Sequence, residues 1–125
     1  MNQRIKIAWV EALRSGEYEQ TSGRLARGGD ELQPPTSFCC LGVLTDMYLK
    51  EKGLAWGSRG SLAQLNEEWK GLLDEEVQAW AGLRDDPSVR FDGSFTTLGS
   101  LNDGVCMDGE PLTFDQIADV IEGEL

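Results

Sequence analysis

The segment 56–61 carries the residues best suited to holding a ligand. Trp56, Ser58 and Arg59 alternate there with glycines. Glycines let backbone N–H groups approach a phosphate, an arginine supplies a fork of donors, and a tryptophan offers a stacking face. The pattern predicts an anion-binding loop. The alternative is a flexible loop with a solvated arginine and a tryptophan packed into the core.

A second glycine-flanked segment repeats this chemistry. Arg24 and Arg27 lie beside Gly23 and Gly28. Neither segment is a P-loop, because neither ends in Gly-Lys followed by Ser or Thr. Together the two segments give the predicted ligand-binding set: Arg24, Arg27, Trp56, Ser58 and Arg59.

The cysteines offer weaker chemistry. Cys39 and Cys40 are adjacent, Cys106 is the third, and the chain has no histidine. The first turn of a helix lowers a thiol pKa and favours a thiolate nucleophile, but no histidine can serve as its base. Buried cysteine is a common core residue, so we expect core packing for the pair. The odd count and the adjacent pair indicate reduced thiols in a cytoplasmic compartment.

Asn102 and Asp103 stand together before Gly104. Asp103 could be a metal ligand or a general base, but short polar side chains at a turn usually bond their own backbone. No Cys-x-x-Cys spacing or EF-hand loop is present. We therefore expect no metal site, no cofactor and no catalytic residue, and we predict that the protein is not an enzyme.

The charge distribution is uneven. The 125-residue chain carries 11 basic and 22 acidic side chains, a net charge of −11. Residues 1–30 hold five basic and four acidic side chains, and the rest of the chain holds six basic and 18 acidic ones. Such a chain should repel duplex DNA. Its acidic face could instead engage a basic surface on another protein, and the plainer interpretation is solubility.

The N-terminus and the apolar runs indicate a protein that stays in the cytoplasm. The sequence that begins Met1-Asn2-Gln3-Arg4 leads into a mixed helix, so it is not a signal peptide. No apolar run approaches the roughly 18 residues that span a bilayer. We expect no membrane partner.

Periodicity and capping signals predict the elements that position these residues. An apolar stripe begins at Ile5 and its helix ends at Gly16. Residues 18–26 read as a short strand or hairpin. A second helix, capped by Thr36 or Ser37, should run from 38 to about 52. Its apolar first turn predicts burial on several sides, and Gly42 predicts a tight neighbouring backbone.

The second half of the chain gives further elements. A short helix is expected over 62–69, and another after Asp74 as far as Leu83. Asp92-Gly93 predicts a hairpin over 89–96, and one helical turn should follow over 98–102. Thr113 and Gln116 predict a capping box for the last helix. The fold class is α+β: one mostly helical domain over 1–125 with one or two small β-hairpins.

Several motifs resemble a family of small uncharacterised proteins of tailed bacteriophages. The distinctive one is FCCLGVL over residues 38–44. It is accompanied by four others: 9–20, 77–83, Leu-Asn-Asp over 101–103, and 113–122 (TFDQIADVIE). Residues 55–69 and 104–111 depart from the pattern. The resemblance supplies no catalytic residue and implies an accessory protein of the kind that includes many inhibitors of host defence.

These observations predict a non-catalytic, phage-encoded counter-defence protein in the cytoplasm of the infected bacterial host. In the leading hypothesis it sequesters a small anionic, nucleotide-type immune signal. It would then be a homo-oligomer, because symmetric subunits readily enclose a pocket. The alternative is an acidic interaction protein that blocks a basic surface of a host protein. A structural or packaging accessory is a third interpretation.

Overall fold

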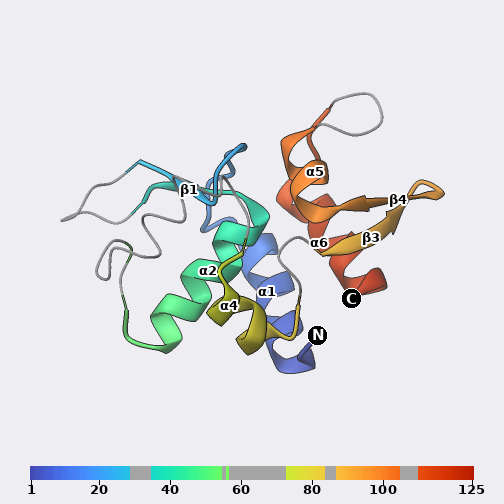
Figure 1. Cartoon of the computed structure of the whole chain (residues 1–125). Coiled ribbons are helices and arrows are strands. Elements are labelled where there is room, and N and C mark those ends of the chain that lie inside the picture. The colour runs from blue at the N-terminus through green and yellow to red at the C-terminus, as the bar shows by residue number, and fades with distance from the viewer. Residues whose placement is uncertain (29–34, 55, 57–72, 84–86, 105–109) are drawn as a thin grey trace.

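The fold is an assembly of short helices around one central helix, with two small sheets at its edges. A computed structural model describes residues 1–28, 35–54, 56, 73–83, 87–104 and 110–125 (Figure 1). In this part of the chain the helices are α1 (Gln3–Arg14), α2 (Cys40–Glu51), α4 (Glu75–Ala81), α5 (Leu98–Asp103) and α6 (Phe114–Glu124). The antiparallel pairs are β1 (Ala26–Arg27) with β2 (Ser37–Phe38), and β3 (Ser88–Phe91) with β4 (Ser94–Thr97). The predicted α+β, mostly helical class is confirmed.

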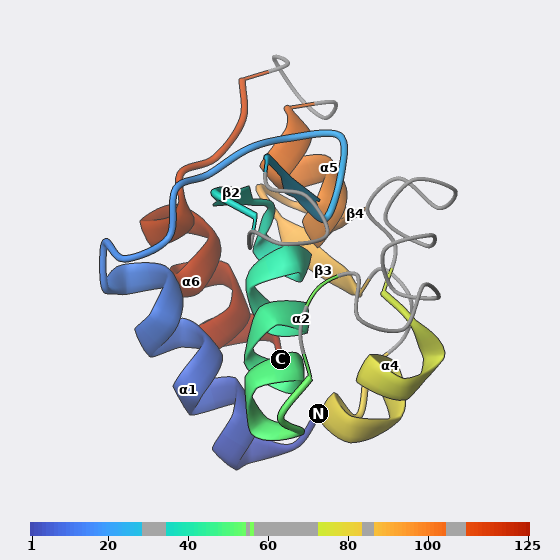
Figure 2. The same cartoon turned by 90° about the vertical axis from the view of Figure 1, so that its left-hand side faces the viewer.

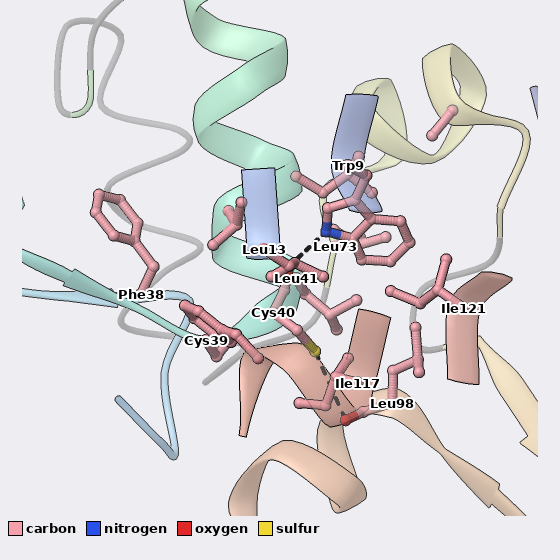
Figure 3. Close-up of a cluster of buried hydrophobic side chains, with 14 of the residues drawn as sticks. Trp9, Leu13, Phe38, Cys39, Cys40, Leu41, Leu73, Leu98, Ile117 and Ile121 are labelled. Carbon is pink, nitrogen blue, oxygen red and sulfur yellow. Dashed lines mark hydrogen bonds between the residues drawn. The ribbon is translucent and has the colours of Figure 1, made fainter. Parts of the chain in front are cut away.

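Helix α2 lies at the centre. Figure 2 shows it between α1 and α4, and α1 packs most extensively on α6. Every residue of the first half of α2, from Cys40 to Asp46, is buried, which confirms the expectation of burial on several sides. Around it the core gathers side chains from α1, α5 and α6, including Trp9, Leu98 and Ile117 (Figure 3).

Gly42 has the close neighbour that the sequence predicts. A Cβ atom at this position would lie 1.7 Å from the carbonyl oxygen of Leu25. The amide of Cys39 donates to the same carbonyl at 3.0 Å. The chain before β1 is therefore pressed directly onto the first turn of α2, and only a glycine leaves room for it.

The start of α2 differs from the prediction. Neither Thr36 nor Ser37 caps the helix; Cys39 does, with an extended backbone and a thiol that accepts from the Gly42 amide at 3.3 Å. The reason is that Phe38 is engaged in sheet hydrogen bonds, donating to Glu19 O and accepting from Thr21 N, both at 2.8 Å. A helix cannot begin until that pairing ends.

Both residues of the cysteine pair are buried, as core packing requires. The Cys40 thiol donates to Leu98 O at 3.7 Å, and the Trp9 indole donates to Cys40 O at 3.0 Å (Figure 3). Cys106 lies outside the described residues. The pair thus joins α1, α2 and α5.

The strand or hairpin predicted over 18–26 is wrong for most of that segment. Gln20 forms only an isolated parallel bridge with Phe38, and Ala26 alone belongs to a strand, paired with Phe38 on its other side. Between them the backbone bends, with Gly23 at φ 80°. The course of residues 18–26 is therefore set by their pairing with Phe38 on both of its sides. The alternation of apolar and polar side chains within the segment does not set it.

The remaining predictions largely hold. Asp92 (φ 52°) and Gly93 (φ 81°) form the turn between β3 and β4, as a two-residue hairpin loop requires. The capping box of Thr113 and Gln116 is present at α6. Helix α4 stops at Ala81 because Gly82 is left-handed, two residues before the predicted end. The helix predicted over 62–69 lies outside the described residues. No helix in the described part of the chain is long and apolar enough to cross a membrane.

Candidate ligand-binding pocket

Trp56 is half-buried and packs against the core. Its indole Nε1 donates to Asp46 Oδ1 at 3.0 Å, and its ring lies 6.1 Å from that of Phe38. Ser58 and Arg59, the other predicted ligand residues of this segment, lie outside the described residues. The described part of the segment therefore matches the alternative in which the tryptophan packs into the core.

Asp46, which is buried, holds this cluster together. Besides Trp56 it accepts from the Tyr18 hydroxyl at 2.6 Å and pairs with Lys50 at 3.0 Å. Burial, and then the hydrogen bond to Asp46, raise the pKa of Tyr18 to about 12. The hydrogen bond to Asp46 also raises the pKa of Lys50. The carboxylate has three partners and is buried, so the cluster anchors the two aromatic side chains.

The two arginines of the first segment differ in burial. Arg24 is half-buried and Arg27 is exposed. Alternation along β1 places Ala26 toward Phe38 and Arg27 on the opposite face of the pair. The structure therefore does not bring Arg27 and Trp56 onto one face.

The Arg27 guanidinium folds back along its own loop. Its Nε and Nη2 donate to Ser22 O at 3.1 and 3.0 Å. This arrangement leaves Nη1 and one Nη2 hydrogen unused, and Arg27 has no ion pair within the described residues. A cationic group with spare donors is thus fixed beside Ser22.

Ser22 lines a pocket of about 440 Å³. The pocket lies between the chain that follows α1 and the segment that leads into α6, which run past each other in Figure 2. Its lining among the described residues is uncharged and consists of hydroxyl, amide and apolar side chains: Gln20, Thr21, Ser22, Asn102, Pro111, Leu112 and Thr113. Volumes of about 300–1,000 Å³ are typical of small-molecule sites.

Asn102 is buried, and its side chain makes hydrogen bonds to several of the segments around this pocket. Its Oδ1 accepts from Cys40 N at 3.2 Å and from Gln20 Nε2 at 3.0 Å, while its Nδ2 donates to Thr21 O at 2.8 Å and to Asp103 Oδ1 at 3.0 Å. All four hydrogen-bonding positions of the amide are used. One side chain from α5 thus fixes the pocket loop to the first turn of α2.

Asp103 supports the same loop from outside the pocket lining. Its Oδ1 accepts from Gly23 N at 3.0 Å as well as from Asn102. The expectation that Asn102 and Asp103 bond the backbone of their own turn is wrong. Apart from the bond between the two side chains, their partners are distant in sequence: Thr21 O for Asn102 and Gly23 N for Asp103. Their role here is to position the 20–23 loop.

Sequence reasoning missed most of the pocket. Gln20 and Thr113 were singled out only for the resemblance and for a helix cap, and Thr21 and Ser22 not at all. Gln20 Nε2 joins the two sides of the pocket by donating to Leu112 O at 2.7 Å. The Leu-Asn-Asp segment was the available signal, since a buried asparagine must find partners. Within the described ranges, no group of three or more His, Cys, Asp or Glu side chains could hold a metal ion.

Comparison with known proteins assigns a family. A family model described as a domain of unknown function, DUF8296, matches residues 1–125, and the chain belongs to that family. No curated protein and no solved structure matches the chain.

Proposed function

We propose that this chain is a non-catalytic binding protein that holds a small anionic ligand in the pocket between residues 20–22 and 111–113. The observation that carries the proposal is a pocket that, among the described residues, has an uncharged lining, together with the Arg27 guanidinium that donates to the carbonyl of the lining residue Ser22. Arginine is suited to phosphate and carboxylate groups because its planar fork donates two parallel hydrogen bonds.

The surrounding charges decide which end of the pocket takes the anion. Glu110 and Asp115 flank the 111–113 side in sequence, so a negative group would be repelled there. The 20–22 side also has a negative carboxylate, that of Asp103, which accepts from Gly23 N and Asn102, but this side has the Arg27 guanidinium as well, bonded to Ser22 O. The anionic group therefore belongs beside Ser22 and Arg27.

The wider role that fits such a binder is sequestration of a host immune signal in the cytoplasm of an infected bacterium. Its support is the resemblance of FCCLGVL and the other motifs to tailed-phage accessory proteins. A homo-oligomer belongs to the same proposal, because a second copy would close a pocket that a small domain leaves open. Sedimentation in the presence and absence of ligand measures that state.

Calorimetric titration with cyclic and linear nucleotides, and with inorganic phosphate, tests the proposal. We expect Arg27→Glu to weaken binding at least tenfold, since a charge-assisted hydrogen bond contributes roughly 1.5–3 kcal/mol and the new carboxylate adds repulsion. Arg90→Glu is the matched control, because Arg90 is also exposed but lies on β3. A flat response to every compound removes the proposal.

Helix α6 supports the second candidate, an acidic surface for a basic host protein. Its exposed side chains include Asp115, Asp119, Glu122 and Glu124, and it carries no lysine or arginine. Arg14 of α1 pairs with Asp119 and Glu122, at 2.5 and 2.7 Å, and offsets part of this charge. A complex formed through this face should weaken steeply with salt.

A further inference from the structure

We infer that the ligand is a phosphorylated sugar whose hydroxyl groups enter the pocket while its phosphate stays at the rim beside Arg27. The inference rests on the proposed function and narrows its ligand class. A free sugar phosphate and the sugar-phosphate part of a nucleotide share this chemistry. What selects a sugar is the balance of donors and acceptors in the pocket.

Gln20 supplies a fixed acceptor. Its Nε2 donates to Asn102 Oδ1 at 3.0 Å and to Leu112 O at 2.7 Å, which uses both amide hydrogens. The amide orientation is thereby settled, and Oε1 is left without a protein partner among the described residues. Gln20 lines the pocket, so a ligand that brings a hydrogen-bond donor can use this acceptor.

The hydroxyl groups that line the pocket near Gln20 can both donate and accept hydrogen bonds. Thr113 Oγ1 accepts from Gln116 N at 3.3 Å, so its proton remains for a ligand. The side chains of Thr21 and Ser22 have no hydrogen bond within the described part of the chain. Sugar hydroxyls, which also donate and accept, match this set.

A phosphate inside the pocket would be poorly placed. Among the described residues, no cationic side chain lines it, and the lining includes Gln20, whose Oε1 is an acceptor. Burying an ionised group without a counter-charge is costly. Pro111 and Leu112 add an apolar wall suited to the C–H face of a sugar ring. The phosphate is better satisfied at Arg27, whose guanidinium already bonds the carbonyl of a lining residue.

Titration of the wild-type chain with methyl phosphate, ribose 5-phosphate and AMP tests the inference. Methyl phosphate carries the anion without hydroxyls. We expect ribose 5-phosphate to bind at least tenfold more tightly than methyl phosphate. AMP binding more tightly still identifies a nucleotide source, and AMP binding equally identifies the sugar phosphate alone; both support the inference. Equal affinities for methyl phosphate and ribose 5-phosphate overturn it and leave the proposed function standing. No binding by any anion overturns both.

A variant pair provides a second measurement. Thr21→Val removes one lining hydroxyl and keeps the side-chain shape, while the backbone groups of Thr21 retain their bonds to Phe38 and Asn102. We expect about a fivefold loss in affinity for ribose 5-phosphate, with methyl phosphate unaffected. Thr96→Val, at a half-buried threonine of β4, is the control and should change neither. Unfolding curves verify that both variants fold, and an unchanged Thr21→Val affinity counts against the inference.

Discussion

Gly42→Ala tests the close contact between the backbone of Leu25 and the first turn of α2. The new methyl group would lie 1.7 Å from Leu25 O and 2.7 Å from Leu25 C, both backbone atoms that cannot rotate away. Helix propensity favours alanine by about 1 kcal/mol, but forcing an extra methyl into a packed site costs about 3 kcal/mol or more when main chain must move. We expect the free energy of unfolding to fall by about 2 kcal/mol or more.

Chemical denaturation followed by tryptophan fluorescence measures this loss. Gly123→Ala is the matched control, because Gly123 lies in α6 with no atom within 4 Å of the added Cβ. That variant should be slightly stabilised, by up to about 1 kcal/mol. A Gly42→Ala protein as stable as the wild type would refute the packing described for Leu25.

Three further outcomes follow from the hydrogen bonds. Asn102→Ala should cost about 3 kcal/mol of stability, because Cys40 N and the pocket loop lose a buried partner; denaturant titration measures it. The pKa of Tyr18 is raised from 10.0 to about 12, so the stability it contributes is present below pH 10 and is lost as pH rises toward 12; Tyr18→Phe should flatten that part of the stability curve. Thr113→Ala removes the α6 cap and should lower stability by about 1 kcal/mol, seen as a lower melting temperature.

Local signals predicted the elements whose causes are local. The Asp92-Gly93 turn and the cap at Thr113 depend on residues within a few positions, and both form as expected. Gly42 was informative for the opposite reason. Glycine has a low helix propensity, so its presence within a helix predicted that a neighbouring backbone lies too close for a side chain. The structure places the backbone of Leu25 there.

Long-range pairing accounts for what the sequence could not reveal. Phe38 has the apolar context of a helical first turn, but hydrogen bonds with Glu19 and Thr21 keep it extended. Trp56 sits in a glycine-rich segment, and its partner Asp46 belongs to α2. The pocket is the extreme case, because Gln20 and Leu112 are more than ninety positions apart. No periodicity or spacing encodes such a meeting.

The central claim is that a small anion binds between residues 20–22 and 111–113, beside Arg27. Amide chemical-shift mapping by NMR during titration with AMP and ribose 5-phosphate tests it most directly. We expect saturable shifts that cluster at Thr21, Ser22, Arg27, Leu112 and Thr113, and we expect Arg27→Glu to abolish them. Shifts confined to other surfaces, or no saturable shift with either compound, would contradict it.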